Sequence, residues 1–370
     1  MHKNWSYSNR PLANIESLLK MLETNEERLA YVLKNKKNYF KTVPVLRKGK
    51  KRTTYKVVGE LLKIHELIKQ HVFSKISLPE YITGGRRGVS YLDDCISHCN
   101  KSIIIQEDIK DFFPSIKEEL IAKAFQYYMN FSPEVSSLIA KLSTLEGSLV
   151  QGTKLSTDIA NLIFLEEEAL ISAEVGKLGG NYTRYVDDIT ISFESEVNNE
   201  DISKIKTMIL SMALKSGVRL NRQKSKVLRN GHSKIVHGVK VIKELRPTQK
   251  RKDSIRMCLF NLKKKVIEKE SIMDILALYF KIRGLINTLK QQGDKNHAEY
   301  IKQANQLVAA VDKKDAIKSI RKMRKVKDVK KLRSFYSKLK PLGNISKTIS
   351  VILDSEYKTC KCKFNNKSIE

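Results

Sequence analysis

The chain has 370 residues, 41% of them hydrophobic, which excludes extended disorder and gives enough length for a large core in two or three domains. Lys and Arg number 70 against 40 Asp and Glu, a formal net charge of +30 that indicates a polyanionic partner: nucleic acid first, with ribosomal or chromatin-type assemblies and anionic lipid as alternatives. The sequence shows no CxxC pair among its five cysteines, no signal-peptide core and no apolar run of membrane length, so we expect a reduced, cytoplasmic protein without a membrane partner.

The first part of the sequence predicts helices around one β-hairpin. Helical spacing of apolar residues over 11–40 indicates one or two amphipathic helices, and residues 60–76 indicate another. Between them, KTVPVLRKGKKRTTYKVV has the pattern of a hairpin with a basic, glycine-containing turn. EYITGGRRGVS (80–90) is predicted to be a loop, because paired glycines permit unusual backbone conformations.

The middle of the sequence alternates short strands and helices. SIIIQ (102–106) predicts a strand that runs into Asp108, and a helical stretch follows Pro114 to about residue 142. Apolar residues recur at helical spacing within and after QGTKLSTDIANLIF (151–164) and again over residues 202–215. Short strands are predicted at VRL, KSKVL and KIVHGVKVI, between residues 218 and 242.

Beyond Arg246 the pattern is almost entirely helical to Lys340, with 27 Lys and Arg against 9 Asp and Glu. A single lysine often only solvates a helix face, but a threefold excess over this length favours a surface that tracks a phosphate backbone. The final segment, EYKTCKCKFNNKSIE, carries no recognisable structural pattern.

Two adjacent carboxylates, Asp187 and Asp188, lie in the predicted hairpin RYVDDITIS. Asp108 ends another predicted strand, so three carboxylates would converge at one sheet edge if the two strands are neighbours. Divalent cations would offset their repulsion there and would suit phosphoryl transfer. The alternative is an exposed type I′ turn, in which Asp is common.

Ordered motifs in this part of the chain resemble the palm of reverse transcriptases. DIKDFFPSI (108–116), QGTKLSTDIANLIF and YVDD (185–188) look like the first three catalytic motifs of that family. LNRQKSKV (220–227) and VHGVKV (236–241) look like the fourth motif and the primer-grip strand. The resemblance runs from about residue 40 to 245 and is closest to bacterial retron-type and related defence-associated reverse transcriptases.

The chain departs from the retron pattern at several positions. DCISH places His98 near the NAxxH segment of retron enzymes, but Asp94-Cys95 replaces Asn-Ala. His237-Gly238 lies near their VTG triplet, with His in place of Thr. Ser156-Thr157 stands where Ser-Pro is usual, and Val186 stands where retron enzymes mostly have alanine.

The resemblance implies an α+β fold, a right-hand polymerase with fingers, a palm of antiparallel sheet plus helices, and a helical basic thumb. The corresponding segments are an N-terminal helical segment at 1–40, fingers at 41–107, a palm at 108–245 with a fingers segment inserted at roughly 117–150, a thumb at 246–340 and a C-terminal tail at 341–370.

The same resemblance implies a catalytic centre with two Mg²⁺ ions, or Mn²⁺ in their place. Asp108, Asp187, Asp188 and the backbone carbonyl of Ile109 would hold these ions. Lys224 matches the position that protonates the departing pyrophosphate, with an ordinary surface lysine as the alternative.

Other positions are implied to contact the substrates. The residues implied to bind the incoming nucleotide are Lys48, Lys50, Arg52, Asp111, Phe113, Gln151, Gly152 and Ser156. Phe113 has the position of a steric gate, a ring that leaves no room for a 2′-hydroxyl, with a core phenylalanine as the alternative. Asp111 and Ser156 could equally be a helix start and a helix cap. The residues implied to contact nucleic acid are Arg86, Arg87, His98, His237 and Gly238.

The resemblance implies an RNA-directed DNA polymerase that copies a structured noncoding RNA into DNA from dNTPs. It also implies a role in anti-phage defence, in which a toxin or effector protein is a further candidate partner. The alternatives are a defence-associated enzyme with untemplated or protein-primed DNA synthesis, and an RNA-binding scaffold without catalysis. Three intact carboxylates argue against the scaffold, since it has no use for charges that repel one another.

Overall fold

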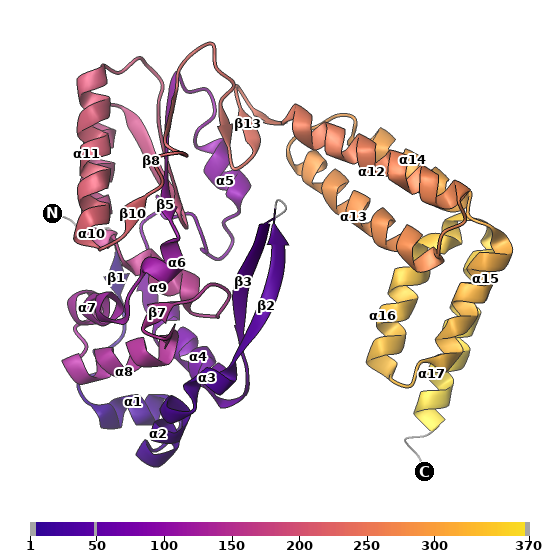
Figure 1. The fold of residues 1–370 in the computed structure, drawn as a ribbon, viewed down its shortest axis with the longest axis horizontal. Helices are drawn as coiled ribbons and strands as arrows, with labels where there is room; N and C mark the ends of the chain where they lie inside the picture. Colours follow the sequence, from indigo (N-terminus) through magenta and orange to yellow (C-terminus); the bar gives the residue numbers. More distant parts are fainter. Residues whose placement is uncertain (1–4, 48–49, 367–370) are drawn as a thin grey trace. The chain divides into compact units, whose positions relative to one another are not determined.

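The computed structural model describes residues 5–47 and 50–366 of the chain. The chain forms two compact units, one of Met1–His237 with Val241–Glu244 and one of Gly238–Lys240 with Leu245–Glu370 (Figure 1). Each unit has its own hydrophobic core. No helix within the described ranges is both long enough and apolar enough to cross a bilayer.

The first unit begins with helices that start at asparagine caps. α1 (Ile15–Met21) and α2 (Glu26–Lys34) follow Asn14 and Asn25, whose side chains accept hydrogen bonds from backbone amides of the first turn. A single further turn, α3 (Lys36–Tyr39), leads into the next strand. The helices predicted for residues 11–40 are therefore confirmed.

The predicted basic hairpin is also present. Its strands, β2 (Phe40–Arg47) and β3 (Lys50–Val57), pair antiparallel over their full length. The segment that follows contains α4 (Gly59–His71), the 3₁₀ turn η1 (Phe73–Lys75), the short pair β1 (Ser6–Tyr7) with β4 (Ile76–Ser77), and α5 (Tyr91–Ile96). The glycine loop at 80–90 ends at Ser90, whose side chain caps α5.

The centre of the first unit is a five-stranded antiparallel sheet in the order β10-β5-β9-β8, with β11 also paired to β5. Its strands are β5 (Ile103–Lys110), β8 (Gly180–Tyr185), β9 (Asp188–Phe193), β10 (Arg219–Leu220) and β11 (Lys226–Leu228). β5 is buried over most of its length, as expected for a strand with neighbours on both sides. The predicted SIIIQ strand and RYVDDITIS hairpin are therefore neighbours.

The first unit also contains further helices and a small ribbon. They are α6 (Phe112–Ser115), α7 (Glu118–Met129), α8 (Pro133–Ser143), α9 (Ser156–Leu162), α10 (Leu165–Lys177) and α11 (Asn199–Lys215), with β6 (Thr144–Leu145) paired to β7 (Ser148–Leu149). α10 packs against β8 and α11, and α11 packs against β10.

The tip of the β8–β9 hairpin is a two-residue turn, Val186–Asp187, because Tyr185 pairs with Asp188. Val186 has φ 61°, a left-handed conformation that is costly for a β-branched residue. Asp187 does not share the positive φ, so the turn resembles type II′ and not the type I′ turn considered from sequence. Asp188 is the first residue of a strand and is not in the turn.

A fully buried ion pair supports this hairpin. Arg184 donates from Nε and Nη2 to the two carboxylate oxygens of Glu168 at 2.5 and 2.9 Å, and both side chains are 0% exposed. Tyr182 donates to the same carboxylate at 2.7 Å. Arg184 Nη1 donates to the Val186 carbonyl at 3.1 Å, so this pair joins the strained turn to α10.

The glycine loop also contacts the hairpin. The Thr83 amide donates to the Arg184 carbonyl at 3.0 Å. A Cβ atom at Gly84 would lie 2.3 Å from the Val186 nitrogen, so only glycine allows the loop to approach the turn this closely.

The second unit is mainly helical, which confirms the helices predicted between Arg246 and Lys340. Its helices are α12 (Gln249–Ile267), α13 (Ile272–Gln291), α14 (His297–Ala309), α15 (Lys313–Arg321), α16 (Val329–Leu339) and α17 (Lys347–Asn366), with 3₁₀ turns η2 (Lys322–Lys325) and η3 (Lys340–Asn344). Ahead of them in the sequence, β12 (Ile235–Val236), β13 (Val239–Val241) and β14 (Leu245–Pro247) form a three-stranded sheet.

The final segment was not recognised as structured from the sequence. Most of it belongs to α17, and Ile349, Leu353 and Cys360 of this helix are buried in the second core. The apolar positions are few among lysines, so the helical period is weak there.

Replacing Glu168 by Gln should destabilise the first unit strongly. The change leaves the buried Arg184 without its counter-charge, and breaking a buried ion pair in this way costs roughly 3–5 kcal/mol. Urea unfolding monitored by circular dichroism measures the loss. Glu166→Gln on the same helix is the matched control, because Glu166 is exposed and its substitution should change stability by less than about 0.5 kcal/mol. Equal effects of the two variants would contradict this assignment.

Acid should destabilise the fold through His65 of α4. Burial lowers the pKa of His65 from 6.5 to about 4, although its Nε2 lies 3.0 Å from the Leu142 carbonyl. Between these pH values the unfolded chain binds the additional proton, so stability falls as pH is lowered, by up to about 3 kcal/mol from this group. Unfolding free energies measured from pH 7 to pH 4 report the slope. His65→Gln should reduce the slope by this group's share, while the buried His98, whose pKa is also lowered to about 4, keeps its own share. His232→Gln, at an exposed position, should leave the slope unchanged.

Candidate active site

Three carboxylates meet at one end of the central sheet. Asp108 in β5 and Asp188 in β9 are register partners, and Asp187 is the adjoining turn residue. The Ile109 amide donates to the Asp187 carbonyl at 2.9 Å, which fixes the turn against β5. The side chain of Asp108 is 5% exposed and that of Asp188 is 48% exposed, so the cluster reaches the surface through Asp188.

The proximity of these charges affects their protonation. Burial, followed by the neighbouring charge of Asp188, raises the pKa of Asp187. Burial also acts to raise the pKa of Asp188, but interaction with His237 outweighs it and the pKa falls. The site therefore concentrates negative charge and relies on nearby cations.

Two side chains from later segments supply those cations. Lys224 Nζ donates to Asp108 Oδ1 at 2.5 Å, and this hydrogen bond raises the pKa of Lys224. His237 Nδ1 lies 3.5 Å from Asp188 Oδ2. Burial alone would lower the pKa of His237, but the two aspartates that it contacts have the larger effect and raise this pKa from 6.5 to about 9.

The donor atoms at this edge suit a hard cation. Carboxylate oxygens are among the ligands that Mg²⁺ prefers, and Asp108, Asp187 and Asp188 lie together at this edge. Within residues 5–47 and 50–366, no three His, Cys, Asp or Glu side chains stand in an arrangement that would hold a metal by itself. Lys224 and His237 pair with two of the carboxylates, so a divalent cation that binds there must replace these contacts.

The residues after Asp108 form a tight turn. Asp111 has φ 47° and precedes α6, and its carbonyl accepts from the Ser115 amide at 3.0 Å. Phe113 in α6 is half-buried, whereas Phe112 is buried and stacks on Phe164 with ring centroids 5.6 Å apart. Phe113 is therefore the aromatic ring of this pair that has an accessible face.

The Gln151-Gly152 segment contacts the basic hairpin. The Tyr55 amide in β3 donates to the Gln151 carbonyl at 2.8 Å. Gly152 has φ 106°, and a Cβ there would lie 2.7 Å from the Tyr55 carbonyl oxygen. Ser156 is 1% exposed and its hydroxyl donates to the Val150 carbonyl at 2.6 Å, so this side chain stabilises the start of α9.

The basic residues of the hairpin turn are only partly described. Lys48 lies outside the described residues. Lys50 and Arg52 are in β3 and pair with Arg47 and Val45, but the description does not extend to their side chains.

The two arginines of the glycine loop differ. Arg86 Nη1 donates to the Pro79 and Glu80 carbonyls at 3.4 and 3.2 Å, so it supports the loop. Arg87 is exposed.

His98 does not fit the predicted contact with nucleic acid. Its side chain is 0% exposed, and its two ring nitrogens lie 2.7 Å from Ser192 Oγ and from Thr183 Oγ1. Burial lowers its pKa to about 4, so it is a neutral residue that joins β8 and β9. His237 is half-buried beside Asp188, and Gly238 has φ 76°.

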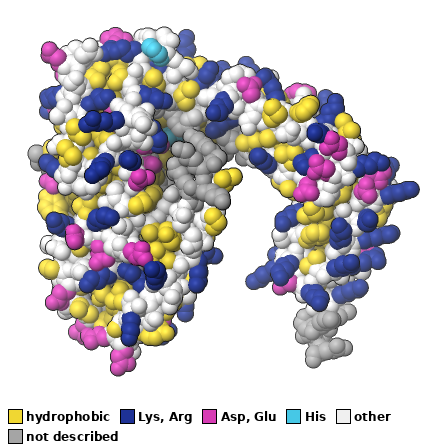
Figure 2. All heavy atoms as spheres, viewed as in Figure 1, with side chains coloured by type: hydrophobic (Ala, Val, Ile, Leu, Met, Phe, Trp, Pro, Cys, Tyr) yellow, Lys and Arg dark blue, Asp and Glu magenta, His cyan; other side chains and the backbone are white. Residues whose placement is uncertain are grey.

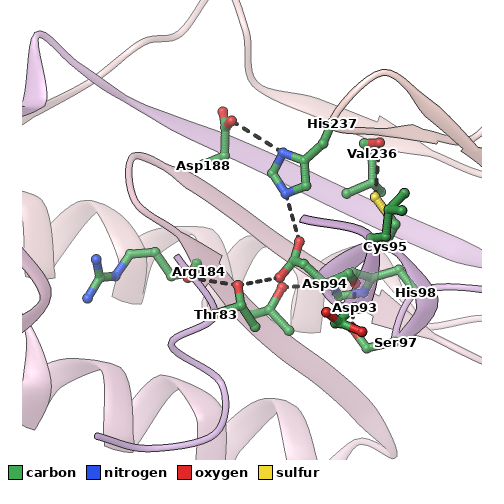
Figure 3. A network of polar contacts seen from close by, with 12 residues as sticks. Thr83, Asp93, Asp94, Cys95, Ser97, His98, Arg184, Asp188, Val236 and His237 are labelled. Atoms are coloured by element: carbon green, nitrogen blue, oxygen red, sulfur yellow. Dashed lines mark hydrogen bonds and ion pairs between the residues drawn. The ribbon is translucent and has the colours of Figure 1, made fainter. Parts of the chain in front are cut away.

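Sequence reasoning missed two groups of residues around this site. One is the Arg184–Glu168 pair, and the other is Thr83 with Asp94, which contacts His237 (Figure 3). A signal for Asp94 was present, because Asp94 and His237 are both departures from the retron pattern.

Comparison with known proteins gives a consistent result. A family model described as reverse transcriptase (RNA-dependent DNA polymerase) matches residues 35–243. The retron Se72 reverse transcriptase of Salmonella heidelberg (strain 579083-10) is 30% identical over 223 residues, 60% of this chain and 59% of that protein. The retron Ec48 reverse transcriptase of Escherichia coli is 24% identical over 331 residues, 85% of this chain and 80% of that protein.

The solved structures give a weaker match. Apo telomerase from Candida tropicalis has 10% sequence identity and a TM-score of 0.43, over 89% of this chain and 65% of that chain.

The expected resemblance to bacterial retron-type enzymes and the expected right-hand polymerase fold are confirmed. The match to the Salmonella relative spans less than two thirds of that protein. The family model covers more than half of the chain and includes the strands that carry Asp108 and Asp188, so this chain belongs to the reverse transcriptase family.

Proposed function

We propose that this chain is an RNA-directed DNA polymerase, which extends a primer with dNTPs on an RNA template. The observation that carries the proposal is the meeting of Asp108, Asp187 and Asp188 at one sheet edge, next to Lys224 and inside the segment matched by the reverse transcriptase family. No other chemistry explains as simply why three carboxylates would be kept together.

The three carboxylates, with the Ile109 carbonyl, would hold the divalent cations. When bound, two Mg²⁺ ions, or Mn²⁺, supply positive charge to the attacking 3′-hydroxyl and to the triphosphate. The buried Asp108 is held by β5 between two paired strands, so it offers a rigid carboxylate. Asp188 is the more exposed partner and faces the substrate side.

Lys224 is suited to the leaving group. Its Nζ is protonated at neutral pH, since the Asp108 carboxylate raises its pKa. The side chain is 56% exposed, so Nζ is free to turn from Asp108 towards a phosphate. We assign Nζ the role of neutralising the departing pyrophosphate and giving it a proton.

The incoming nucleotide would lie between the basic hairpin and the turn after Asp108. The hydrogen bond from Tyr55 to Gln151 joins the hairpin to the Gln151-Gly152 segment, which supports a common binding surface. Lys48, Lys50 and Arg52 would contact the triphosphate, and the half-buried Phe113 would contact the sugar. Asp111 would lie near the triphosphate. Ser156 would act indirectly, by stabilising the start of α9.

The template and primer would contact basic surfaces. Figure 2 shows Lys and Arg side chains spread over the visible face of the second unit. The exposed basic residues of α16 include Lys330, Lys331, Arg333 and Lys338. Such a surface binds a duplex by its phosphates. In the first unit, the exposed Arg87 would contact the template backbone.

The relatives support a more specific substrate. Both matched proteins are named as retron reverse transcriptases, so we propose that the template is part of a dedicated structured RNA. A role in anti-phage defence, a toxin or effector partner and a cytoplasmic location belong to the same proposal and rest on this relationship alone.

Substituting Asp187 or Asp188 by Ala should abolish primer extension. Each change removes a cation ligand, and a loss of about 4 kcal/mol or more in transition-state stabilisation corresponds to about a thousandfold in rate. The measurement is incorporation of labelled dNTPs on an RNA template with Mg²⁺, after circular dichroism has verified folding. Asp201→Ala, in the first turn of α11 and outside the cluster of Asp108, Asp187 and Asp188, is the control.

Retained activity in both Asp variants would show that the site is wrongly assigned. Sequencing of nucleic acid that copurifies with the wild-type protein identifies the template. One abundant RNA joined to complementary DNA supports the proposed substrate, whereas DNA of random sequence or DNA linked to protein would replace it with untemplated or protein-primed synthesis.

Phe113→Ala should relax discrimination against ribonucleotides. Removing the ring opens space for the 2′-hydroxyl, and a steric difference of this kind is worth about tenfold or more in relative incorporation. The ratio of rates with each rNTP and dNTP measures it. Phe112→Leu is the control, because Phe112 is buried against Phe164 and should change stability without changing the ratio. An unchanged ratio in Phe113→Ala would assign this ring to the core.

A further inference from the structure

Two positions where the chain departs from the retron pattern contact each other. Asp94 on α5 and His237 after β12 are 143 residues apart in sequence, yet His237 Nε2 lies 2.7 Å from Asp94 Oδ2 (Figure 3). The retron pattern has the neutral residues Asn and Thr at these two positions. The chain therefore carries a matched pair of charges in place of two neutral side chains.

Asp94 is held in place independently of His237. It is 1% exposed, and its other oxygen, Oδ1, accepts from Thr83 Oγ1 at 2.7 Å. Thr83 Oγ1 in turn lies 3.2 Å from the Arg184 carbonyl in β8. A buried carboxylate without a cation would be costly, so Asp94 depends on His237 for its charge balance.

The other side of the His237 ring faces Asp188. His237 Nδ1 lies 3.5 Å from Asp188 Oδ2, an ion-pair distance that is too long for a strong hydrogen bond. Asp94 Oδ2 accepts an N–H from His237 Nε2 at 2.7 Å, whereas the contact of Nδ1 with Asp188 is 0.8 Å longer. Tyr185 packs beside the ring with centroids 4.8 Å apart.

The two distances indicate different roles for the two carboxylates. His237 is bound closely by Asp94 and loosely by Asp188, so Asp94 fixes where the His237 ring stands. We propose that Asp94 anchors the His237 ring beside Asp188, and that this pair positions the Asp188 carboxylate for a divalent cation without capturing it.

This inference rests on the proposed function, because it assigns Asp188 as a cation ligand. Asp94 and His237 are positioning residues, since they act through Asp188. Residues that orient a metal ligand typically change metal affinity by about 10–100-fold when substituted.

The first test is Mn²⁺ binding, measured by electron paramagnetic resonance of the free ion with the full-length protein and no substrate. In Asp94→Asn, His237 loses its anchor and pairs fully with Asp188, so Mn²⁺ affinity should fall about tenfold. Asp93→Asn is the matched control: it is the same chemical change at the adjacent residue, which is exposed and bonds to Ser90. Unchanged affinity in Asp94→Asn would overturn the proposal.

The second test asks whether Asp94 and His237 stabilise each other. His237→Thr leaves Asp94 buried and unpaired, so the unfolding temperature should fall by roughly 10 °C. The double variant Asp94→Asn/His237→Thr, which has the two neutral residues of the retron pattern, should recover most of that loss. A double variant no more stable than His237→Thr would overturn the pairing.

Asp188→Asn separates failure of this inference from failure of the proposed function. Mn²⁺ binding that survives Asp188→Asn would overturn the site on which both depend. Binding that is lost in Asp188→Asn but unchanged in Asp94→Asn would overturn only the role of the pair.

Discussion

Repulsion among carboxylates at one edge of the central sheet is the constraint around which the first unit is organised. Asp108 and Asp188 face each other across β5 and β9, and Asp187 adjoins them, so the sheet brings together charges that would separate in water. Lys224 and His237 offset this charge, and both come from segments that follow the hairpin. The negative charges on β5 and β9 are therefore offset only when the segment from Arg219 to His237 has folded beside these strands.

Periodicity made much of this fold predictable. The apolar run of β5, the alternation in the hairpin and the helical spacing of α4 and α11 each reflect burial on one face, which a single sequence records directly. The convergence of Asp108 with Asp187 and Asp188 was also predictable. The sequence predicted both strands, and the order of the reverse transcriptase motifs placed the three residues in one palm.

Other features depend on contacts that no local pattern records. Glu168 and Arg184 look like surface charges in the sequence, yet each is fully buried because the other neutralises it. His98 was predicted to contact nucleic acid from its place in a motif, but its position between Thr183 and Ser192 is set by tertiary packing. The position of Ser156 is likewise set by tertiary packing, since its hydroxyl donates a hydrogen bond to the Val150 carbonyl.

The close approach of Gly84 to Val186 has a mechanical consequence. With only 2.3 Å between the Val186 nitrogen and the place where a Cβ would stand, the glycine loop and the hairpin tip have no room to slide past each other. Two backbone hydrogen bonds to the Arg184 carbonyl join them further. A displacement of the loop at Thr83 or Gly84 would therefore push directly on Val186, the residue next to Asp187.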